Sequence, residues 1–282
     1  MKTQLLLLLI LPIIIPHHLY SQPVLDSAAA EGRLLFAPLV AHHIEPRMGF
    51  SRLAGEDRLR LDIGNSVDLL RWEDVAEGSL AVGADFFTWT SLRQEEDFHF
   101  PVDAVDYLFG LNASYRKVHD ESLTMTYRLR LSHISAHMVD GSYEKENAAW
   151  RDGQLPRVYS REYVEVIAAS ELYETVRLYA GGQYIYHIDP AELGKWAAQF
   201  GGEAVLSGLL GAGVHPYVAL DARLLDVGGW SASVNAQIGV KFGSWRGTGV
   251  NVFLAWFDGK SQHGEYHDQH WSYWGPGLNI EF

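Results

Sequence analysis

Long stretches in which apolar and polar residues alternate one by one constrain this sequence more than any other feature. From Leu123 to Leu131 every second residue is apolar, and the residues between them are threonine or arginine. The same alternation recurs from Ala232 to Phe242. A period of two places successive side chains on opposite faces of a β-strand. The pattern therefore predicts strands with one apolar and one polar face.

The length of these runs indicates where such strands reside. A tilted strand needs roughly ten residues to cross a bilayer, whereas strands in soluble proteins usually have about five or six. The chain also ends on an aromatic residue, Phe282, in a last alternating segment. This end resembles the terminal strand of bacterial outer-membrane barrels, which the barrel-insertion machinery reads. We expect an all-β fold, a transmembrane up-and-down antiparallel β-barrel, with that machinery, outer-membrane lipid and lipopolysaccharide as partners.

The alternating runs give twelve strands, or ten if the two weakest runs, 46–54 and 200–208, are not strands. The predicted strands are 46–54, 57–72, 78–91, 104–118, 121–138, 159–172, 175–188, 200–208, 214–225, 230–243, 247–257 and 270–282. The long connections between them are 92–103, 139–158, 189–199 and 258–269. Long connections are extracellular in outer-membrane barrels, so the last strand should run down to a periplasmic C-terminus.

Residues 1–21 have the pattern of a cleaved export signal. A charged start precedes an apolar run at 5–15, and a small residue, Ser21, ends an acceptable cleavage site. The run is too short to span a bilayer as a helix. Residues 22–45 then fit either a periplasmic extension or a plug, before a barrel at 46–282. The expected location is the outer membrane of a Gram-negative-type envelope.

Composition excludes several other classes. The chain has no cysteine, so disulfides, thiolate metal sites and a lipoprotein anchor on an N-terminal cysteine are ruled out. Its formal net charge of −13 with no basic tract argues against nucleic-acid binding. Aromatic residues make up 12% of the chain, which is typical of proteins that meet membrane interfaces. No cofactor is expected.

The stretch RLRLSHISAHMVDG, residues 128–141, places His133, Ser135 and His137 at every second position. Strict alternation would put these three side chains on the lipid-facing side with Leu129 and Leu131. A β-bulge near Ser132 would instead turn them inward. The sequence leaves both orientations open.

The spacing of these residues limits their chemistry. His133 and His137 are roughly 13 Å apart on a strand, so they cannot share a metal ion, and no metal site is predicted. A serine becomes a nucleophile when a histidine acts as its base and an acid orients that histidine. Small-barrel lipid A deacylases look similar here, with His-x-Ser on one strand and Glu on the next. In this chain the next strand offers Glu162 and Glu165, and Glu165 is preferred as the catalytic partner of His133 and Ser135.

The alternative is a polar network with no chemistry, and we expect this to be the main role of the region. Arg128 and Arg130 would brace lumen carboxylates such as Asp106 or Glu162, with His137 and Asp140 completing the network, because buried charges in a barrel must be paired. The predicted function is then a structural, binding or narrow-pore barrel. The alternative function is a lipid A or phospholipid ester hydrolase at the outer leaflet.

A second polar group lies in the long connection before the last strand. It contains His263, Glu265, His267, Asp268 and His270. Such a set could hold a divalent cation, but a solvated polar loop is the preferred interpretation.

Five segments together resemble the exported bacterial proteins grouped as domain of unknown function 1207. The segments are LFAPLVAHHIEPRMGFS, FPVDAVDYLFG, RLSHISAHMVDG, SREYVEV and VRLYAGGQY. The resemblance runs from about Leu35 to about Glu203. It implies an outer-membrane barrel and brings no assigned chemistry. One departure is that an Ala-Asp-Pro-Arg-like run is expected where this chain has Ala41-His42-His43-Ile44, which puts in doubt any role of an acid there.

Overall fold

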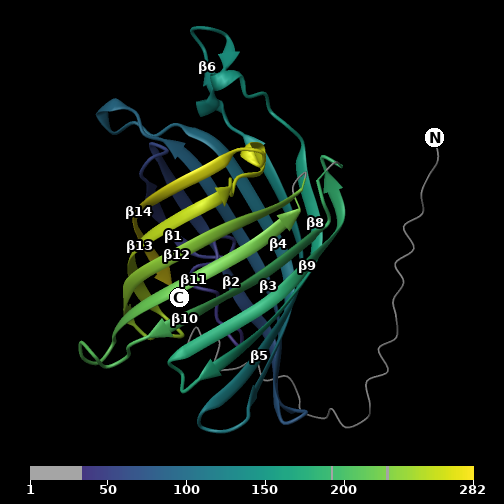
Figure 1. Cartoon of the computed structure of the whole chain (residues 1–282), viewed down its shortest axis with the longest axis vertical. Coiled ribbons are helices and arrows are strands. Elements are labelled where there is room, and N and C mark those ends of the chain that lie inside the picture. Colours follow the sequence, from purple (N-terminus) through teal and green to yellow (C-terminus); the bar gives the residue numbers. More distant parts are fainter. Residues whose placement is uncertain (1–33, 192, 227–228) are drawn as a thin grey trace, which may run out of the picture.

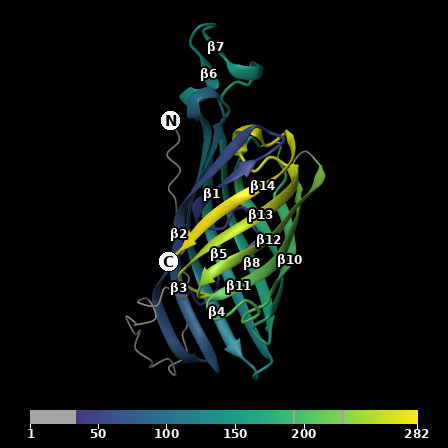
Figure 2. The same ribbon diagram turned by 90° about the vertical axis from the view of Figure 1, so that its left-hand side faces the viewer.

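A closed antiparallel barrel of twelve strands forms the part of the chain that the computed structural model describes, residues 34–191, 193–226 and 229–282 (Figures 1 and 2). Each strand pairs with its neighbours along the chain, and β1 pairs with β14 to close the barrel. The bounds are β1 (Met48–Leu53), β2 (Arg58–Val75), β3 (Gly78–Arg93), β4 (Val102–Val118), β5 (Leu123–Met138), β8 (Tyr159–Leu172), β9 (Val176–Asp189), β10 (Trp196–Val205), β11 (Val214–Asp226), β12 (Trp230–Gly243), β13 (Gly249–Lys260) and β14 (His270–Glu281). The predicted fold and strand number are confirmed, and the ten-strand alternative is wrong.

The connection between β5 and β8 carries a separate small hairpin, β6 (Tyr143–Glu144) with β7 (Ala149–Trp150). This hairpin projects beyond one end of the barrel, seen at the top of Figure 1. We call this end, with the connections 94–101, 139–158 and 261–269, the loop end, and the opposite end the turn end. No helix among the described residues is long and apolar enough to cross a membrane.

The largest error in the predicted boundaries concerns β10, which begins at Trp196 rather than at residue 200. Trp196 pairs with Tyr184 of β9, with ring centroids 4.7 Å apart. The two central glycines, Gly201 and Gly202, weaken the strand pattern in the sequence. Gly201 is required because a Cβ there would lie 2.3 Å from the Tyr179 hydroxyl oxygen.

The strands separate polar and apolar side chains as the alternation predicts. On β5, Thr126, Arg128 and Arg130 are buried inside, whereas Leu129 and Leu131 are exposed on the outside. The barrel therefore has a polar interior and an apolar outer wall, as in a bilayer-spanning barrel.

Residues 34–47, which we call the inner segment, contact the inner face of the wall. Their backbone meets side chains of several strands: the Leu35 amide donates to Asp68, the Val40 amide donates to Glu203, and the Ala37 carbonyl accepts from Arg177. These polar groups satisfy an irregular backbone that has no sheet partners of its own. Residues 1–33, which include the predicted export signal and the first part of the predicted extension or plug, lie outside the described residues.

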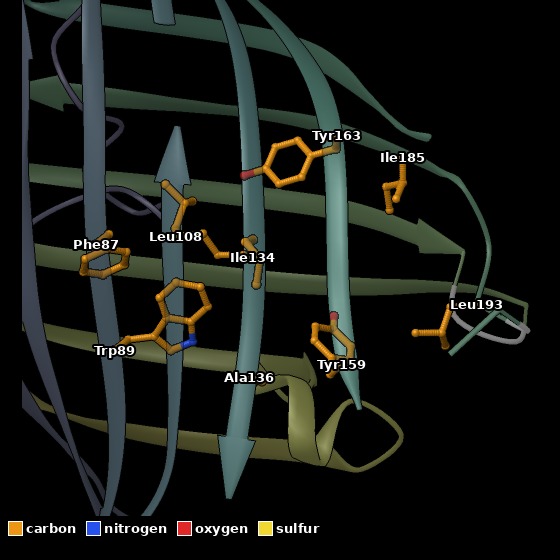
Figure 3. Close-up of a cluster of buried hydrophobic side chains, with 10 residues drawn as sticks. Phe87, Trp89, Leu108, Ile134, Ala136, Tyr159, Tyr163, Ile185 and Leu193 are labelled. Carbon is orange, nitrogen blue, oxygen red and sulfur yellow. The ribbon is translucent and has the colours of Figure 1, made fainter. Parts of the chain in front are cut away.

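The first part of the connection 261–269 folds into the loop end of the barrel, so the expectation of a solvated loop is wrong for His263 and Glu265, whereas Asp268 and His270 are exposed. Its residues His263, Glu265 and Tyr266 are buried. Trp89 on β3 donates to the Gln262 carbonyl oxygen at 2.9 Å. Beneath this loop lies a cluster of buried apolar side chains along β3, β4, β5, β8 and β9 (Figure 3). The interior is thus occupied by the loop, this cluster and the inner segment.

Candidate functional site

Three polar side chains face outward near the loop end of β5. The β5 register with β4 and β8 runs without a shift from one end to the other. His133, Ser135 and His137 therefore continue the outward set of Leu129 and Leu131. Of the two orientations that the sequence left open, the structure has strict alternation.

The His133 side chain meets a carboxylate on the neighbouring strand. His133 pairs in register with Glu162 of β8, which pairs with His187 of β9. The hydrogen bond between His133 Nδ1 and Glu162 Oε1 is 2.6 Å long, and His187 Nδ1 contacts the other oxygen, Glu162 Oε2. One carboxylate thus bridges two imidazoles and engages Nδ1 of each, which leaves both Nε2 atoms for other partners.

The next outward-facing row, two register pairs nearer the loop end, adds two serines and a tyrosine. Ser135 pairs with Tyr107 of β4 on one side and with Ser160 of β8 on the other. The Ser160 hydroxyl donates to Glu162 Oε1 at 3.3 Å, and the Tyr107 ring lies edge-on to His137 with centroids 5.9 Å apart. We call His133, Ser135, His137, Ser160, Glu162, His187 and Tyr107 the outer cluster.

The outward row on the turn-end side of the His133 pair is apolar and aromatic. It consists of Leu131, Val164, Tyr184 and Trp196, on four successive strands. Leu131, Tyr184 and Trp196 are exposed. Aromatic residues gather at the level of lipid headgroups, next to the apolar band. The outer cluster therefore adjoins an apolar and aromatic row and lies on its loop-end side.

A packed interior holds the outer cluster from behind. Ile134 and Ala136, which alternate with the outward residues of β5, belong to the buried apolar cluster with Tyr159 and Tyr163 of β8 (Figure 3). Burial of these side chains fixes the two strands against each other. The register that brings His133 to Glu162 is fixed in turn, because a slip of one residue would turn every side chain to the other face.

A second network fills the barrel interior. Arg128 donates to Glu45 at 2.9 and 2.6 Å and to Glu165 at 3.0 Å. Arg130 donates to Asp85 at 2.9 Å and to Glu45 at 3.2 Å. All five residues are buried. Glu165 therefore lies on the opposite side of the wall from His133 and Ser135, and the carboxylate that contacts His133 is Glu162.

The expected pairing of Arg128 and Arg130 with Asp106 or Glu162 is not found. Asp106 instead accepts from His263 Nδ1 at 2.8 Å and from the Gly264 amide at 2.7 Å, which anchors the connection 261–269. Asp140 is exposed at the start of a short 3-10 turn, η2 (Asp140–Ser142), away from both networks.

The family resemblance predicts an acidic residue before a Pro-Arg pair in this region, and Glu45 is such a residue. Glu45 precedes Pro46 and Arg47, so the chain reads Glu-Pro-Arg after the His42-His43 pair. Sequence reasoning missed Glu45, Asp85 and His187. The Pro46-Arg47 pair that follows Glu45 could have pointed to it in the sequence. Asp85 and His187 could be found only from the pairing of strands in the structure.

Comparison with solved structures gives outer-membrane barrels. Outer membrane phospholipase A from Escherichia coli has a TM-score of 0.51 and 11% sequence identity, over 83% of this chain and 91% of that chain. The outer membrane phospholipase dimer of Salmonella typhi with bound calcium gives 0.49, at 11% identity over 79% of each chain. The β domain of the Bordetella autotransporter BrkA gives 0.40, at 15% identity over 83% and 97%.

The fold is thus that of outer-membrane barrels, which supports an outer-membrane location. No curated protein sequence matched the chain. A family model matches residues 100–282, further towards the C-terminus than the resemblance seen in the sequence. This match covers more than half of the chain, which therefore belongs to the family described as protein of unknown function, DUF1207.

Proposed function

We propose that this barrel is an ester hydrolase that acts on lipids of the outer leaflet, with Ser135 as nucleophile and His133 as base. One observation carries the proposal: the 2.6 Å hydrogen bond between His133 Nδ1 and Glu162 on the outward face of the wall. It fixes the ring and leaves Nε2 as the basic atom. Glu162 would have the orienting role that a catalytic triad gives to its acid.

The proposed chemistry is acyl transfer through serine. The Ser135 hydroxyl attacks the ester carbonyl carbon while His133 Nε2 takes its proton. The tetrahedral intermediate collapses, and the alkoxide leaves with the proton from His133. Water, deprotonated by the same imidazole, then releases the fatty acid from Ser135. Two residues along a strand are roughly 6.6 Å apart, so Ser135 would approach Nε2 through its rotamer, as catalytic hydrogen bonds often tighten only with substrate.

The position of the outer cluster supports a lipid substrate. A charged side chain on the lipid face costs roughly 2–4 kcal/mol at the bilayer midplane when it is Arg or Lys, and less when it is Asp or Glu; the cost falls to about 0–1 kcal/mol near an interface. A Glu162 flanked by His133 and His187 is therefore compatible with the headgroup level and not with the midplane. With the long connections outside, this level belongs to the outer leaflet, where the ester bonds of lipids lie against the wall.

The occupied interior argues against a narrow pore. Most of the inner segment and residues 262–266 of the last connection are buried within it, so these parts of the described chain obstruct a path for a solute. One of the proteins with a similar fold is named a phospholipase. This likeness supports the proposal only by showing that a barrel of this kind occurs in a protein with that name. A purely structural or binding barrel is the remaining alternative, and the experiment below separates it from the enzyme.

The test uses the purified full chain in mixed micelles with a phospholipid or with lipid A, and mass spectrometry of released fatty acid. We expect release by the native protein. His133→Gln and Ser135→Ala should lower the rate by about 10²–10⁴-fold, the usual contribution of a positioned base. Ser160→Ala is the matched control, because this serine shares the same face and contacts Glu162 without being assigned the attack.

Two results would contradict the proposal. If the native protein releases no fatty acid from either substrate, the barrel is a structural or binding protein. If Ser160→Ala abolishes release and Ser135→Ala does not, the nucleophile has been misassigned. Equal folding of all variants is checked by their mobility on unheated detergent gels.

A further inference from the structure

Two consecutive histidines of the inner segment meet an aspartate of the wall in the barrel interior. A turn at 39–42, with the His42 amide donating to the Leu39 carbonyl oxygen at 3.2 Å, brings the His42 and His43 rings to 5.4 Å between centroids. Asp221 projects from β11. Ligand atoms of His42, His43 and Asp221 all lie within 4.8 Å of one another.

All three side chains are buried. His42 and Asp221 are each 1% exposed, and His43 is 7% exposed. No other group of three or more histidine, aspartate or glutamate residues in the described part of the chain meets the same distance criterion. The histidine and carboxylate ligands therefore converge at one point, which bulk water does not reach freely.

One of the possible ligand atoms, a histidine ring nitrogen, lacks the partner that burial normally demands. His42 Nε2 is buried and has no hydrogen-bond partner among the described residues. Asp221 forms no ion pair with a described basic residue within 4.0 Å; its Oδ2 accepts from Tyr179 at 2.9 Å and from Gln199 at 2.6 Å. A buried carboxylate without a cation is costly, because buried charges are normally paired or bind metals.

We propose that His42, His43 and Asp221 bind one divalent transition-metal ion of the Zn²⁺ class. Two imidazoles and one carboxylate are ligands that Zn²⁺ accepts, with bonds of about 2.0–2.2 Å and a further position for water. Bonds of that length require the three donors to move closer together than the 4.8 Å limit, which changes of side-chain rotamer can supply. Such an ion would give His42 Nε2 a partner and would place a cation in contact with the Asp221 carboxylate.

The surroundings of the three residues have features of a metal site. His42 Nδ1 lies 3.4 Å from Glu45 Oε1, and a metal-ligating histidine usually donates its other ring nitrogen to such an acceptor. Two guanidinium groups bind the backbone carbonyl oxygens of the histidine pair: Arg47 donates to that of His42 and Arg60 to that of His43. Arg60 is itself paired with Asp62 at 2.7 Å, so its charge is compensated.

The role of this ion would be to join the inner segment to β11. The inner segment has no strand pairing of its own, and metal ligands from two distant parts of a chain contribute folding energy directly. This role is independent of the outer cluster, because Asp221 and His133 lie on opposite faces of the wall and on different strands.

The experiment measures Zn²⁺ bound to the full chain in detergent after treatment with a chelator. Equilibrium dialysis with elemental analysis gives the stoichiometry, and Co²⁺ substitution gives a visible spectrum that reports nitrogen and oxygen ligands. We expect one tightly bound ion in the native protein, lost in His42→Gln and in Asp221→Asn. The matched control is His187→Gln, which removes an imidazole from the outer cluster and should keep the ion. Zn²⁺ should raise the Tm of the native protein and of the control only.

The proposal fails if the chelated native protein takes up no Zn²⁺, or if His42→Gln and Asp221→Asn keep the stoichiometry of the native protein. Loss of the ion in His187→Gln alone would also overturn it, by placing the ion on the outer wall. Unheated gel mobility verifies that each variant retains the closed barrel, so a misfolded variant is replaced by His43→Gln.

Discussion

Arg128 of β5 forms a two-pronged ion pair with Glu45 of the inner segment, at 2.9 and 2.6 Å, between residues that lie 83 positions apart in the sequence. Both side chains are buried, with 4% and 1% of their side-chain surface exposed. The planar guanidinium matches the carboxylate in geometry. This pair holds an irregular segment against a regular wall.

Removing one partner of this pair should be costly. We expect Arg128→Met to lower the free energy of unfolding by about 3–5 kcal/mol, because it leaves Glu45 buried with less compensation. Denaturant unfolding of the detergent-solubilised protein measures this change. Arg71→Met is the control, since Arg71 pairs with Glu73 near the surface at 2.7 Å and exposed pairs contribute about 0–1 kcal/mol.

A double-mutant cycle on Arg128 and Glu45 distinguishes the energy of their ion pair from a general loss of packing. The double variant Arg128→Met, Glu45→Gln should cost less than the sum of the two single changes, since the second change removes the stranded charge. Strict additivity would show that the ion pair does not stabilise the inner segment.

Because the interior is occupied, we expect the barrel to conduct no ions in electrical recordings. In a planar bilayer the native protein should show no steady conductance, because most of the inner segment and residues 262–266 are buried inside the wall. A variant that lacks both residues 34–47 and residues 262–266 should conduct, since water could then enter the interior from both ends. Steady native currents equal to those of the deletion variant would contradict this view of the interior.

Period two was sufficient to predict the barrel from sequence because each strand separates lipid from a polar interior over most of its length. The predicted strands at 159–172, 214–225 and 230–243 differ from β8, β11 and β12 by at most one residue at either end. The strand at 200–208 was placed too late because Gly201 and Gly202 carry no side chains to reveal the pattern. The interior remained hidden, since the inner segment has no periodicity and its order comes from contacts with distant strands.

The candidate site was only half visible in the sequence. His133 and Ser135 stand out at their spacing, and strict alternation gives their outward direction. Their acid was misassigned to Glu165 because depth was judged without the register. Glu162 and Glu165 are three residues apart and so point to opposite faces, and the pairing of β5 with β8 selects Glu162. His187 lies on β9, and only the register between β8 and β9 shows that it pairs with Glu162.

Asp106 should control the connection 261–269. Its two oxygens accept from His263 Nδ1 and from the Gly264 amide. Asp106→Ala leaves two buried donors unsatisfied, at about 1–3 kcal/mol each. We expect faster hydrogen exchange in 262–266 and greater exposure of Trp271, whose ring lies 5.6 Å from that of His263, with a red shift of its fluorescence. Asp140→Ala, a change at an exposed carboxylate, is the control and should leave both readouts unchanged.

The loop end should also loosen in acid. Two hydrogen bonds from Arg157, each 2.9 Å long, hold the pKa of Asp268 below its usual range. A carboxyl with a lowered pKa stabilises the fold above its unfolded pKa, near 3.9, and this contribution is lost as the pH falls through the folded pKa.

Burial acts in the opposite direction on Glu265 and raises its pKa. Its contribution is therefore present below the unfolded pKa, near 4.3, and declines as the pH rises through the folded pKa. The two trends oppose each other, so we expect the tether from Arg157 to Asp268 to stabilise the loop end most well above pH 4, and the burial of Glu265 to cost least in acid.

Hydrogen exchange at 154–158 and 264–268, corrected for intrinsic rates, checks both trends. Protection of 154–158 in the native protein should fall below about pH 4, by an amount worth about 0.2–1 kcal/mol because the Arg157–Asp268 pair is partly exposed to solvent. Asp268→Asn should remove this acid-dependent step and leave the Glu265 trend in place. An unchanged acid step in Asp268→Asn would assign the pH response to another carboxyl and contradict the tether.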